Sequence, residues 1–239
     1  MRVNRLDMIR VLKIVKSIDA ESVKFEEDGK FSVLAGTAGI LYGKGLNLGR
    51  KLGLGNVDKL MKLLEQFPDI EVNVNFEDSK VVISGGKSLV YWYRLTAPEH
   101  IKNDIIPEKV AVINQGEWIE GTFGIEELME IKKLLPALDS EDAEVQGNLT
   151  FFTDEGRLKC TVGSKTRNGG QIELGDLKLP VPYSFWVSKI VKILNVLDES
   201  RVKVAFRVDD KKLVRFQLTG FTWILGALIE EKEEPKVTK

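Results

Sequence analysis

The feature of the sequence that most constrains the fold is an 18-residue pattern that occurs twice, 130 positions apart. The segment KLMKLLEQFPDIEVNVNF at 59–76 aligns without a gap with KIVKILNVLDESRVKVAF at 189–206. Both copies begin with a Lys-x-x-Lys pair and end in the alternation of apolar and polar residues that is typical of a strand. Because solenoid repeats have periods of roughly 20 to 50 residues, this longer period predicts a duplicated domain.

The two halves of the chain carry the same order of predicted elements. Positions 4–18 and 124–138 have helical spacing, and each is followed by a hairpin with its turn at 28–29 or at 155–156. Further strands and a second helix complete each copy, and the second copy adds a polar insertion at 139–147. Two helices with many strands predict an α+β unit in which the helices cover one face of an antiparallel sheet.

Composition shifts along the chain predict where the copies begin and end. We expect the first copy at 1–95 and the second at 117–229. The segment 96–116 reads as a connector, because it contains two prolines and lacks a clear periodicity. The charged tail 230–239 is expected to be mobile.

The charge balance and the rarity of metal-binding residue types exclude several classes of protein. With 35 basic and 36 acidic side chains, the chain is nearly neutral, and its overall charge does not indicate a nucleic-acid-binding protein. Its single cysteine, Cys160, excludes an internal disulfide, and together with the single histidine, His100, it cannot build a metal cluster. We therefore expect no metal and no cofactor. No apolar run is long enough to be a signal core or to span a bilayer, which predicts a soluble cytoplasmic protein with no membrane partner.

Three of the four predicted helices have a basic side opposite their apolar side. In the second helix, Lys59 and Lys62 fall opposite the arc that holds Leu60 and Leu64. Lysine is common on solvated helix faces, so the pattern by itself leaves open whether these side chains bind a partner. The third helix differs, because three glutamates precede its two lysines. The basic residues on the three helices are Arg5, Arg10, Lys13, Lys16, Lys59, Lys62, Lys189 and Lys192.

Three segments resemble the DNA sliding clamps, the rings that give polymerases their processivity. KLGLGNVDKLMKLLEQF at 51–67 resembles the strand and second helix of proliferating cell nuclear antigen. SLVYWYRLTAP at 88–98 is similar to a strand with a Val-Tyr-Trp sequence in the clamps of tailed phages. GGQIELGDL at 169–177 looks like an interface strand of the second domain. The order and spacing of nearly the whole chain are similar to the two-domain form of this family.

The resemblance implies a fold and a mode of action. Two such domains make one subunit, three subunits close a ring with sheets outside, and two helices per domain line the hole. The basic residues of the helices would then contact the phosphates of duplex DNA without reading its sequence. The implied partners are duplex DNA, a DNA polymerase and an ATP-dependent clamp loader, and the implied place is the nucleoid of a cell or of an infected cell. No enzymatic activity is implied.

Two further sites follow. An exposed aromatic strand at 88–95 needs a cover, so we expect it to pair with 171–175 of the next subunit. The residues of this predicted interface are Leu89, Val90, Tyr91, Trp92, Tyr93, Gln171, Ile172, Glu173 and Leu174.

The resemblance also implies a pocket for partner peptides. The apolar residues of this pocket could instead simply close the domain boundary. The residues of this pocket are Ile40, Ile105, Ile106, Leu225, Ala227 and Leu228.

A glycine-rich segment at 36–55 offers a different function, a nucleotide-binding enzyme. Only three residues separate Gly39 from Gly43, however, and Gly45 follows Lys44 where a phosphate-binding loop has Ser or Thr. Strand ends with tight turns are the favoured interpretation. A DNA-binding or protein-interaction module that forms no ring also remains open, and the native mass would separate it from a trimeric clamp.

Overall fold

The fold is built from two runs of elements in the same order. The computed structural model describes residues 1–35, 39–45, 47–86, 88–105, 107–138, 147–163 and 169–228. In the first half, a strand and a helix are followed by four strands, a second helix and three strands. These elements are β1 (Arg2–Asn4), α1 (Arg5–Lys16), β2 (Val23–Phe25), β3 (Lys30–Ala35), β4 (Gly39–Lys44), β5 (Leu52–Leu54), α2 (Val57–Glu65), β6 (Glu71–Phe76), β7 (Lys80–Gly85) and β8 (Leu89–Arg94).

The second half repeats this order and adds a short 3-10 turn after its first helix. Its elements are β9 (Trp118–Gly124), α4 (Ile125–Lys133), η2 (Leu135–Ala137), β10 (Asn148–Asp154), β11 (Arg157–Gly163), β12 (Gly169–Gly175), β13 (Tyr183–Trp186), α6 (Val187–Leu194), β14 (Arg201–Arg207), β15 (Leu213–Leu218) and β16 (Phe221–Gly226). The repetition confirms the duplicated α+β fold. The boundaries at 1–95 and 117–229 stay predictions.

Between the two halves, the chain forms two elements that the sequence did not predict. They are the 3-10 turn η1 (Pro98–His100) and the helix α3 (Pro107–Asn114). None of the residues of α3 is fully buried, so the helix carries no apolar stripe that a periodicity search could detect. Among the described residues, no helix combines the length and the apolar character needed to cross a membrane.

In the described part of the chain, the strands form three antiparallel sheets, and the largest is shared by both halves. The first half ends in a four-stranded sheet of order β1-β6-β7-β8, and the second contains a four-stranded sheet of order β12-β11-β10-β13. The central sheet has eight strands in the order β5-β2-β3-β4-β16-β15-β14-β9. Its two halves meet where β4 pairs with β16, with Ile40 opposite Ile224.

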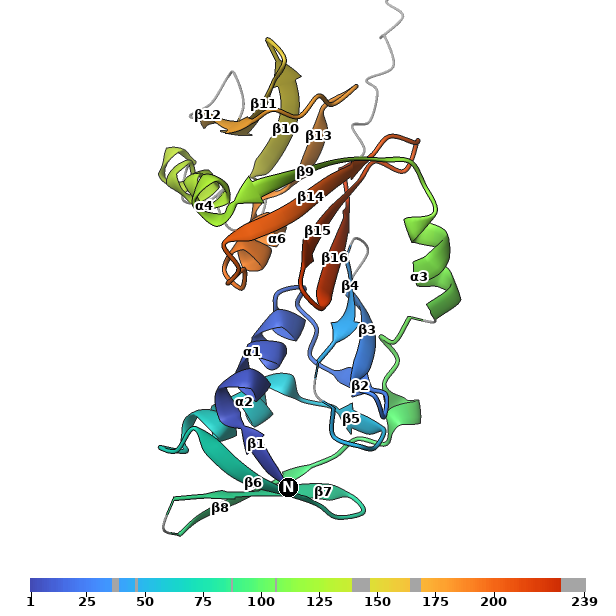
Figure 1. Cartoon of the computed structure of the whole chain (residues 1–239), viewed down its shortest axis with the longest axis vertical. Coiled ribbons are helices and arrows are strands. Elements are labelled where there is room, and N and C mark those ends of the chain that lie inside the picture. The colour runs from blue at the N-terminus through green and yellow to red at the C-terminus, as the bar shows by residue number, and fades with distance from the viewer. Residues whose placement is uncertain are drawn as a thin grey trace, which may run out of the picture.

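The helices are divided between the two sides of the central sheet (Figure 1). α1, α2, α4 and α6 lie on one side, which we call the helix face, and α3 lies on the other, which we call the outer face. On the helix face, Trp223 of β16 is buried against α1, and its Nε1 donates a hydrogen bond to Ser17 Oγ at 2.8 Å. One continuous cluster of buried apolar residues contains members of both halves. The core therefore crosses the joint between β4 and β16.

Local signals fix the ends of the helices and the hairpin turns. Asn4 Oδ1 accepts a hydrogen bond from the amide of Leu6 at 2.9 Å, so α1 begins at the next residue after this cap. Asn56 caps α2 in the same way. In the hairpin turns, Gly29 and Gly156 have φ angles of 84° and 81°, a region that glycine enters without steric cost.

Candidate nucleic-acid interface and partner groove

The eight cations predicted to contact DNA all belong to α1, α2 and α6. None is fully buried. Their apolar neighbours on the same helices, such as Leu60 and Leu64, are almost completely buried. The amphipathic division read from the sequence is therefore present in the structure. Contact between these cations and DNA remains a prediction.

Two of the lysines share one carboxylate from the other half of the chain. Lys189 Nζ and Lys192 Nζ of α6 lie 2.7 Å and 2.5 Å from the two carboxylate oxygens of Asp19, which follows α1. Partial burial by itself would raise the pKa of Asp19, but the hydrogen bonds from the two lysines outweigh it and lower the pKa. This arrangement could not be predicted from the sequence, because the partners are 170 and 173 positions apart.

A second ion pair also joins the two halves across the helix face. The guanidinium of Arg10 forms a bidentate pair with Asp198, which follows α6, and its Nη2 lies 2.9 Å from Asp198 Oδ1. The same guanidinium lies over the ring of Phe221 at 5.4 Å. The hydrogen bond to Asp198 raises the pKa of Arg10. Lys16 pairs with Asp58 of α2 at 2.9 Å, so carboxylates already partly neutralise four of the eight cations.

Arg5 is engaged with the backbone rather than with a carboxylate. Its Nε donates to Asp69 O at 2.9 Å, and its Nη1 lies 3.4 Å from Leu64 O at the end of α2. The Leu64 carbonyl is among those that a helix end leaves without an intrahelical partner, and Asp69 lies in the segment that follows α2. The side chain therefore holds α1 to the end of α2, a role that its basic character alone did not reveal.

The remaining three cations keep their charge available. Within the described residues, Lys13, Lys59 and Lys62 have no carboxylate within 4 Å. The helix α4 has a mixed surface, as predicted, and its Lys133 pairs with Glu130 at 2.5 Å. The available positive charge of the helix face is therefore concentrated on α1 and α2.

The two strands predicted to form the subunit interface are both edges of their sheets. β8 is the last strand of one four-stranded sheet, and β12 is the first strand of the other. Trp92 is 68% exposed and Val90 is 47% exposed, which is unusual for large apolar side chains on an edge strand. Tyr93 and Leu174, each 3% exposed, face the core, so only their backbone groups remain available to pair. Pairing between subunits stays a prediction.

A groove of about 500 Å³ lies on the outer face between the central sheet and the connector. It has an apolar wall and a charged rim. The wall contains Phe31, Tyr42, Ile105, Pro107 and Val110. The rim contains Lys24, Glu26, Lys30, Lys44 and Asp104.

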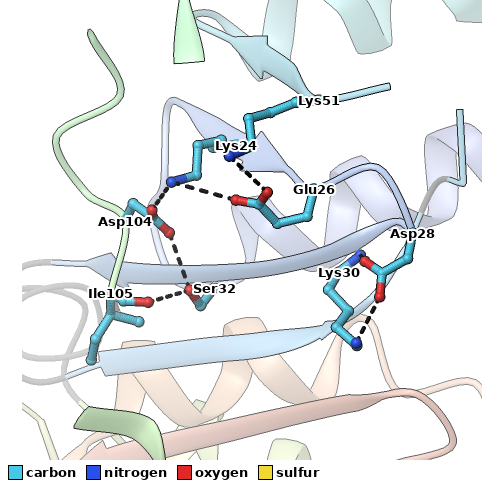
Figure 2. A network of polar contacts seen from close by, with 8 residues as sticks. All are labelled: Lys24, Glu26, Asp28, Lys30, Ser32, Lys51, Asp104 and Ile105. Carbon is cyan, nitrogen blue, oxygen red and sulfur yellow. Dashed lines mark hydrogen bonds and ion pairs between the residues drawn. The ribbon is translucent and has the colours of Figure 1, made fainter. Parts of the chain in front are cut away.

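The connector is held to the sheet at one side of this groove by a polar network (Figure 2). Lys24 Nζ donates a hydrogen bond to the Asp104 carboxylate, and Ser32 Oγ lies 2.5 Å from Ile105 O and 3.1 Å from Asp104 Oδ1. The hydrogen bond to Asp104 raises the pKa of Lys24. Glu26 extends the network to Lys51, because the Glu26 carboxylate lies 2.9 Å from Lys51 Nζ.

Side chains of the outer face hold α3 in place. Tyr42 Oη lies 3.0 Å from Asn114 Nδ2, and Arg207 Nη1 donates to Ile113 O at 2.7 Å. Arg215 lies over the ring of Trp118 at 4.5 Å and also contacts Asn114. The helix therefore forms a fixed wall of the groove although it buries little of its own surface.

Only part of the predicted peptide pocket coincides with this groove. Ile105 lines it, and Ile106 lies outside the described residues. Leu225 is a core residue, which corrects its assignment to the pocket, because it points to the same side of β16 as Trp223. The error arose because a central strand buries both of its faces, and its sequence does not tell them apart.

The other predicted pocket residues lie away from the described lining of the groove. Ile40 is opposite Ile224, at the end of β4 that is farther from Lys44. The amides of Ala227 and Leu228 donate to Lys212 O at 2.8 Å and to Ser184 O at 2.7 Å. The alternation of residues in ILYGK could have identified Tyr42 as a residue that points out of the sheet and into the groove. Val110 lines the groove only because α3 forms there, and the sequence did not predict that helix.

The described part of the glycine-rich segment has a structural explanation. Gly39–Lys44 is β4, in the middle of the central sheet, and the next helix along the chain is α2, which begins at Val57. A Cβ at Gly43 would lie 2.3 Å from Gly220 O, so glycine permits the close approach of the neighbouring backbone. The strand-to-helix turn of a phosphate-binding loop is therefore absent from this described segment.

Cys160 is buried, which raises the pKa of its thiol.

Comparison with solved structures identifies proteins with the same fold. The β subunit of DNA polymerase III from Thermotoga maritima has a TM-score of 0.70 at 14% identity over 98% of this chain and 65% of that one. A. fulgidus PCNA, solved with the C-terminal region of FEN-1 bound, has a TM-score of 0.69 at 14% identity over 97% and 98%. The Helicobacter pylori β clamp bound to a DNA ligase peptide has a TM-score of 0.65 at 14% identity over 98% and 68%.

The chain spans about 65% of the length of several bacterial β clamps that it matches. No protein-family model matches the sequence, and a search of curated proteins gives no match. At these identities, the structural likenesses establish the fold.

Proposed function

We propose that this chain, which has the fold of the DNA sliding clamps, is a subunit of a ring that encircles duplex DNA and holds a DNA polymerase on it. The observation that carries the proposal is the arrangement of the two copies: their helices share one face, and their outermost strands are unpaired edges. The helix face would line the hole, and the edges would join subunits.

The ring would close by pairing of β8 with β12 of the next subunit. Each chain has one edge of each kind, and head-to-tail pairing of different edges produces a closed ring when the rotation is right. We propose a homotrimer, because the two copies resemble the two domains of trimeric clamps and the chain matches 98% of A. fulgidus PCNA. The apolar side chains of Val90 and Trp92 would then be covered.

DNA would be held mainly by enclosure. The unpaired lysines of α1 and α2 would contact phosphates as diffuse charges, which gives no sequence preference and allows sliding. A net charge of −1 is compatible with this mode, because strong overall attraction to DNA is not needed. We propose no enzymatic activity for the chain, and we place its action in the cytoplasm, at the nucleoid.

The groove beside the connector would take a short peptide of the polymerase or of an ATP-dependent clamp loader. Its apolar wall suits an aromatic anchor, which is the usual source of affinity in such sites. The two solved neighbours that hold FEN-1 and DNA ligase segments support protein partners for this fold.

The native mass is the test. Sedimentation equilibrium should give three times the chain mass of 26.9 kDa. After loading by the cognate loader, the protein should remain on closed circular DNA and be lost from the same DNA once it is linearised. A monomeric mass, or equal retention on circular and linear DNA, would instead indicate a module that binds DNA without encircling it.

A further inference from the structure

A large basic hollow lies on the flank of the first half, separate from the partner groove. It has a volume of about 690 Å³ and is bordered by the segment before β5, the start of α2, the end of β8 and the start of the connector. Four of its side chains are cationic, whereas its described lining contains one carboxylate, that of Asp78. The four cations are Arg50, Lys51, Lys59 and Arg94.

These cations are exposed and mostly without compensating acids. Lys51 pairs with Glu26 at 2.9 Å, and Arg50 lies over the ring of Phe76 at 5.5 Å. Lys59 and Arg94 have no carboxylate within 4 Å in the described part of the chain. In a protein with a net charge of −1, this is a local concentration of available positive charge.

The floor of the hollow is rigid and polar. A Cβ at Gly53 would lie 2.2 Å from Thr96 O, so β5 and the start of the connector are in direct backbone contact. Tyr93 is buried below them, and its hydroxyl exchanges hydrogen bonds with the backbone of Asn56 at 2.8 Å and 2.9 Å. In the described lining, Tyr93 is buried, and the exposed imidazole of His100 is the one ring on which a base could stack.

The hollow is continuous with the proposed DNA face. A second hollow, of about 540 Å³ beside α2, shares Asn56 and Lys59 with it and also contains Lys62. A path therefore leads from the exposed side of α2 to the flank of the first half. Lys59 and Lys62 line it together with the carboxylates of Glu21 and Asp58, and Asp58 is paired with Lys16.

We propose that this hollow binds the phosphates of a single DNA strand that leaves the duplex held at the helix face. The proposal rests on the proposed function. Basic grooves that follow a backbone are the usual means of binding single strands without sequence preference. Because the described lining offers four cations and a single exposed ring, that of His100, its contribution is mainly electrostatic and decreases steeply with salt. Its volume and the spread of its cations over three segments fit a strand better than a single anion.

The test compares two labelled probes, a blunt hairpin duplex and the same duplex with a single-stranded arm, by fluorescence anisotropy at rising salt. Wild type should bind the armed probe more tightly. The Arg50→Ala/Arg94→Ala variant should lose this preference, and its salt slope on the armed probe should fall by about 1.4, for two single-strand contacts at about 0.7 each. Its binding of the blunt probe should not change.

The controls distinguish a loss of charge in this hollow from a loss of positive charge elsewhere on the protein and from a loss of folding. Lys102→Ala/Lys109→Ala removes two exposed cations of the connector and α3 and should leave the preference intact. Arg50→Lys/Arg94→Lys should also retain it, because diffuse phosphate contacts need charge and not a planar group. Unchanged thermal melting of Arg50→Ala/Arg94→Ala would show that the fold is kept.

Retention of the wild-type preference by Arg50→Ala/Arg94→Ala would overturn the proposal. Full displacement of the armed probe by inorganic phosphate at the same phosphate concentration would also overturn it, since the hollow would then be a site for a single anion. If the blunt duplex does not bind while binding of the armed probe still depends on Arg50 and Arg94, the hollow binds a single strand as proposed. The helix face then does not bind duplex DNA, which contradicts the proposed function.

Discussion

At the residue scale, the helix face is a set of charges that are already partly satisfied within the chain. Lys189 and Lys192 share Asp19, and Arg10 is held by Asp198. In the proposed ring, phosphates would therefore have to compete with carboxylates for these side chains, whereas Lys13 and Lys59 carry no such constraint in the described structure. Such an arrangement would favour weak and easily exchanged contacts with DNA.

Replacing Asp19 should reveal this competition. Asp19→Asn releases two lysines per chain, so duplex affinity should rise and its salt slope should become steeper by about 1.8, for two contacts at about 0.9 each. The change is measured by anisotropy with a blunt duplex. Asp7→Asn, the same charge change at the exposed start of α1, serves as control. Equal slopes for wild type and Asp19→Asn would mean that Lys189 and Lys192 do not contact phosphate.

The same substitution has a pH-dependent cost in stability. Because the pKa of Asp19 is lowered in the folded protein, its contribution to stability is present above the unfolded value of about 3.9 and is lost as the pH falls through the lower folded value. Urea unfolding should therefore show Asp19→Asn to be less stable than wild type at pH 7, and the difference should disappear in strong acid. A difference that persists there would point to packing instead of charge.

Arg5 should behave differently from the other cations. Arg5→Ala removes two bonds from a charged donor to backbone carbonyls and should lower the free energy of unfolding by about 1–2 kcal/mol, since the side chain is partly exposed. Lys13→Ala should leave stability nearly unchanged and lower the salt slope of duplex binding. The opposite ranking, with Arg5→Ala stable and defective on DNA, would restore the role predicted from the sequence.

At the scale of elements, the sequence predicted what depends on local signals. The turns at 28–29 and 155–156 and the amphipathic helices are encoded within a few residues. The helix α3 and the pairing of β4 with β16 were not predicted, because they depend on contacts between distant segments. For the same reason, the sequence showed that Arg5 and Lys189 lie on the basic sides of their helices, but it did not show that they contact Leu64 and Asp19.

The attachment of the connector can be tested at this scale. Asp104→Ala removes the acceptor of Lys24 and loosens the segment whose Asn103 O accepts a hydrogen bond from the Leu34 amide at 2.7 Å. Hydrogen exchange of that amide should become about tenfold faster, which corresponds to about 1.4 kcal/mol of local opening. Glu108→Ala, on the exposed start of α3, is the control. Unchanged exchange would show that the Asp104 carboxylate is not needed to hold the connector to β3.

At the scale of the whole molecule, the exposed edge strand is the place where assembly can be broken without harming the fold. Val90→Glu/Trp92→Glu puts two charges on β8 and should convert the proposed trimer into monomers in sedimentation, with little change in melting temperature, because both side chains are exposed. Val112→Glu, an equally exposed apolar residue of α3, should leave the trimer intact. A trimer that survives the double substitution would place the interface elsewhere.

The shared central sheet gives a ring of such chains two unequal kinds of seam. Inside each chain, the seam is the ladder from Phe221 opposite Gly43 to Leu225 opposite Gly39, and it is backed by a core that runs straight across it. Between chains, the proposed seam is a ladder of edge strands. A protease cut in the connector should therefore leave the two pieces associated on a native gel. In the proposed ring, a gap for DNA to enter would form between chains, while each chain stays one rigid segment of the circle.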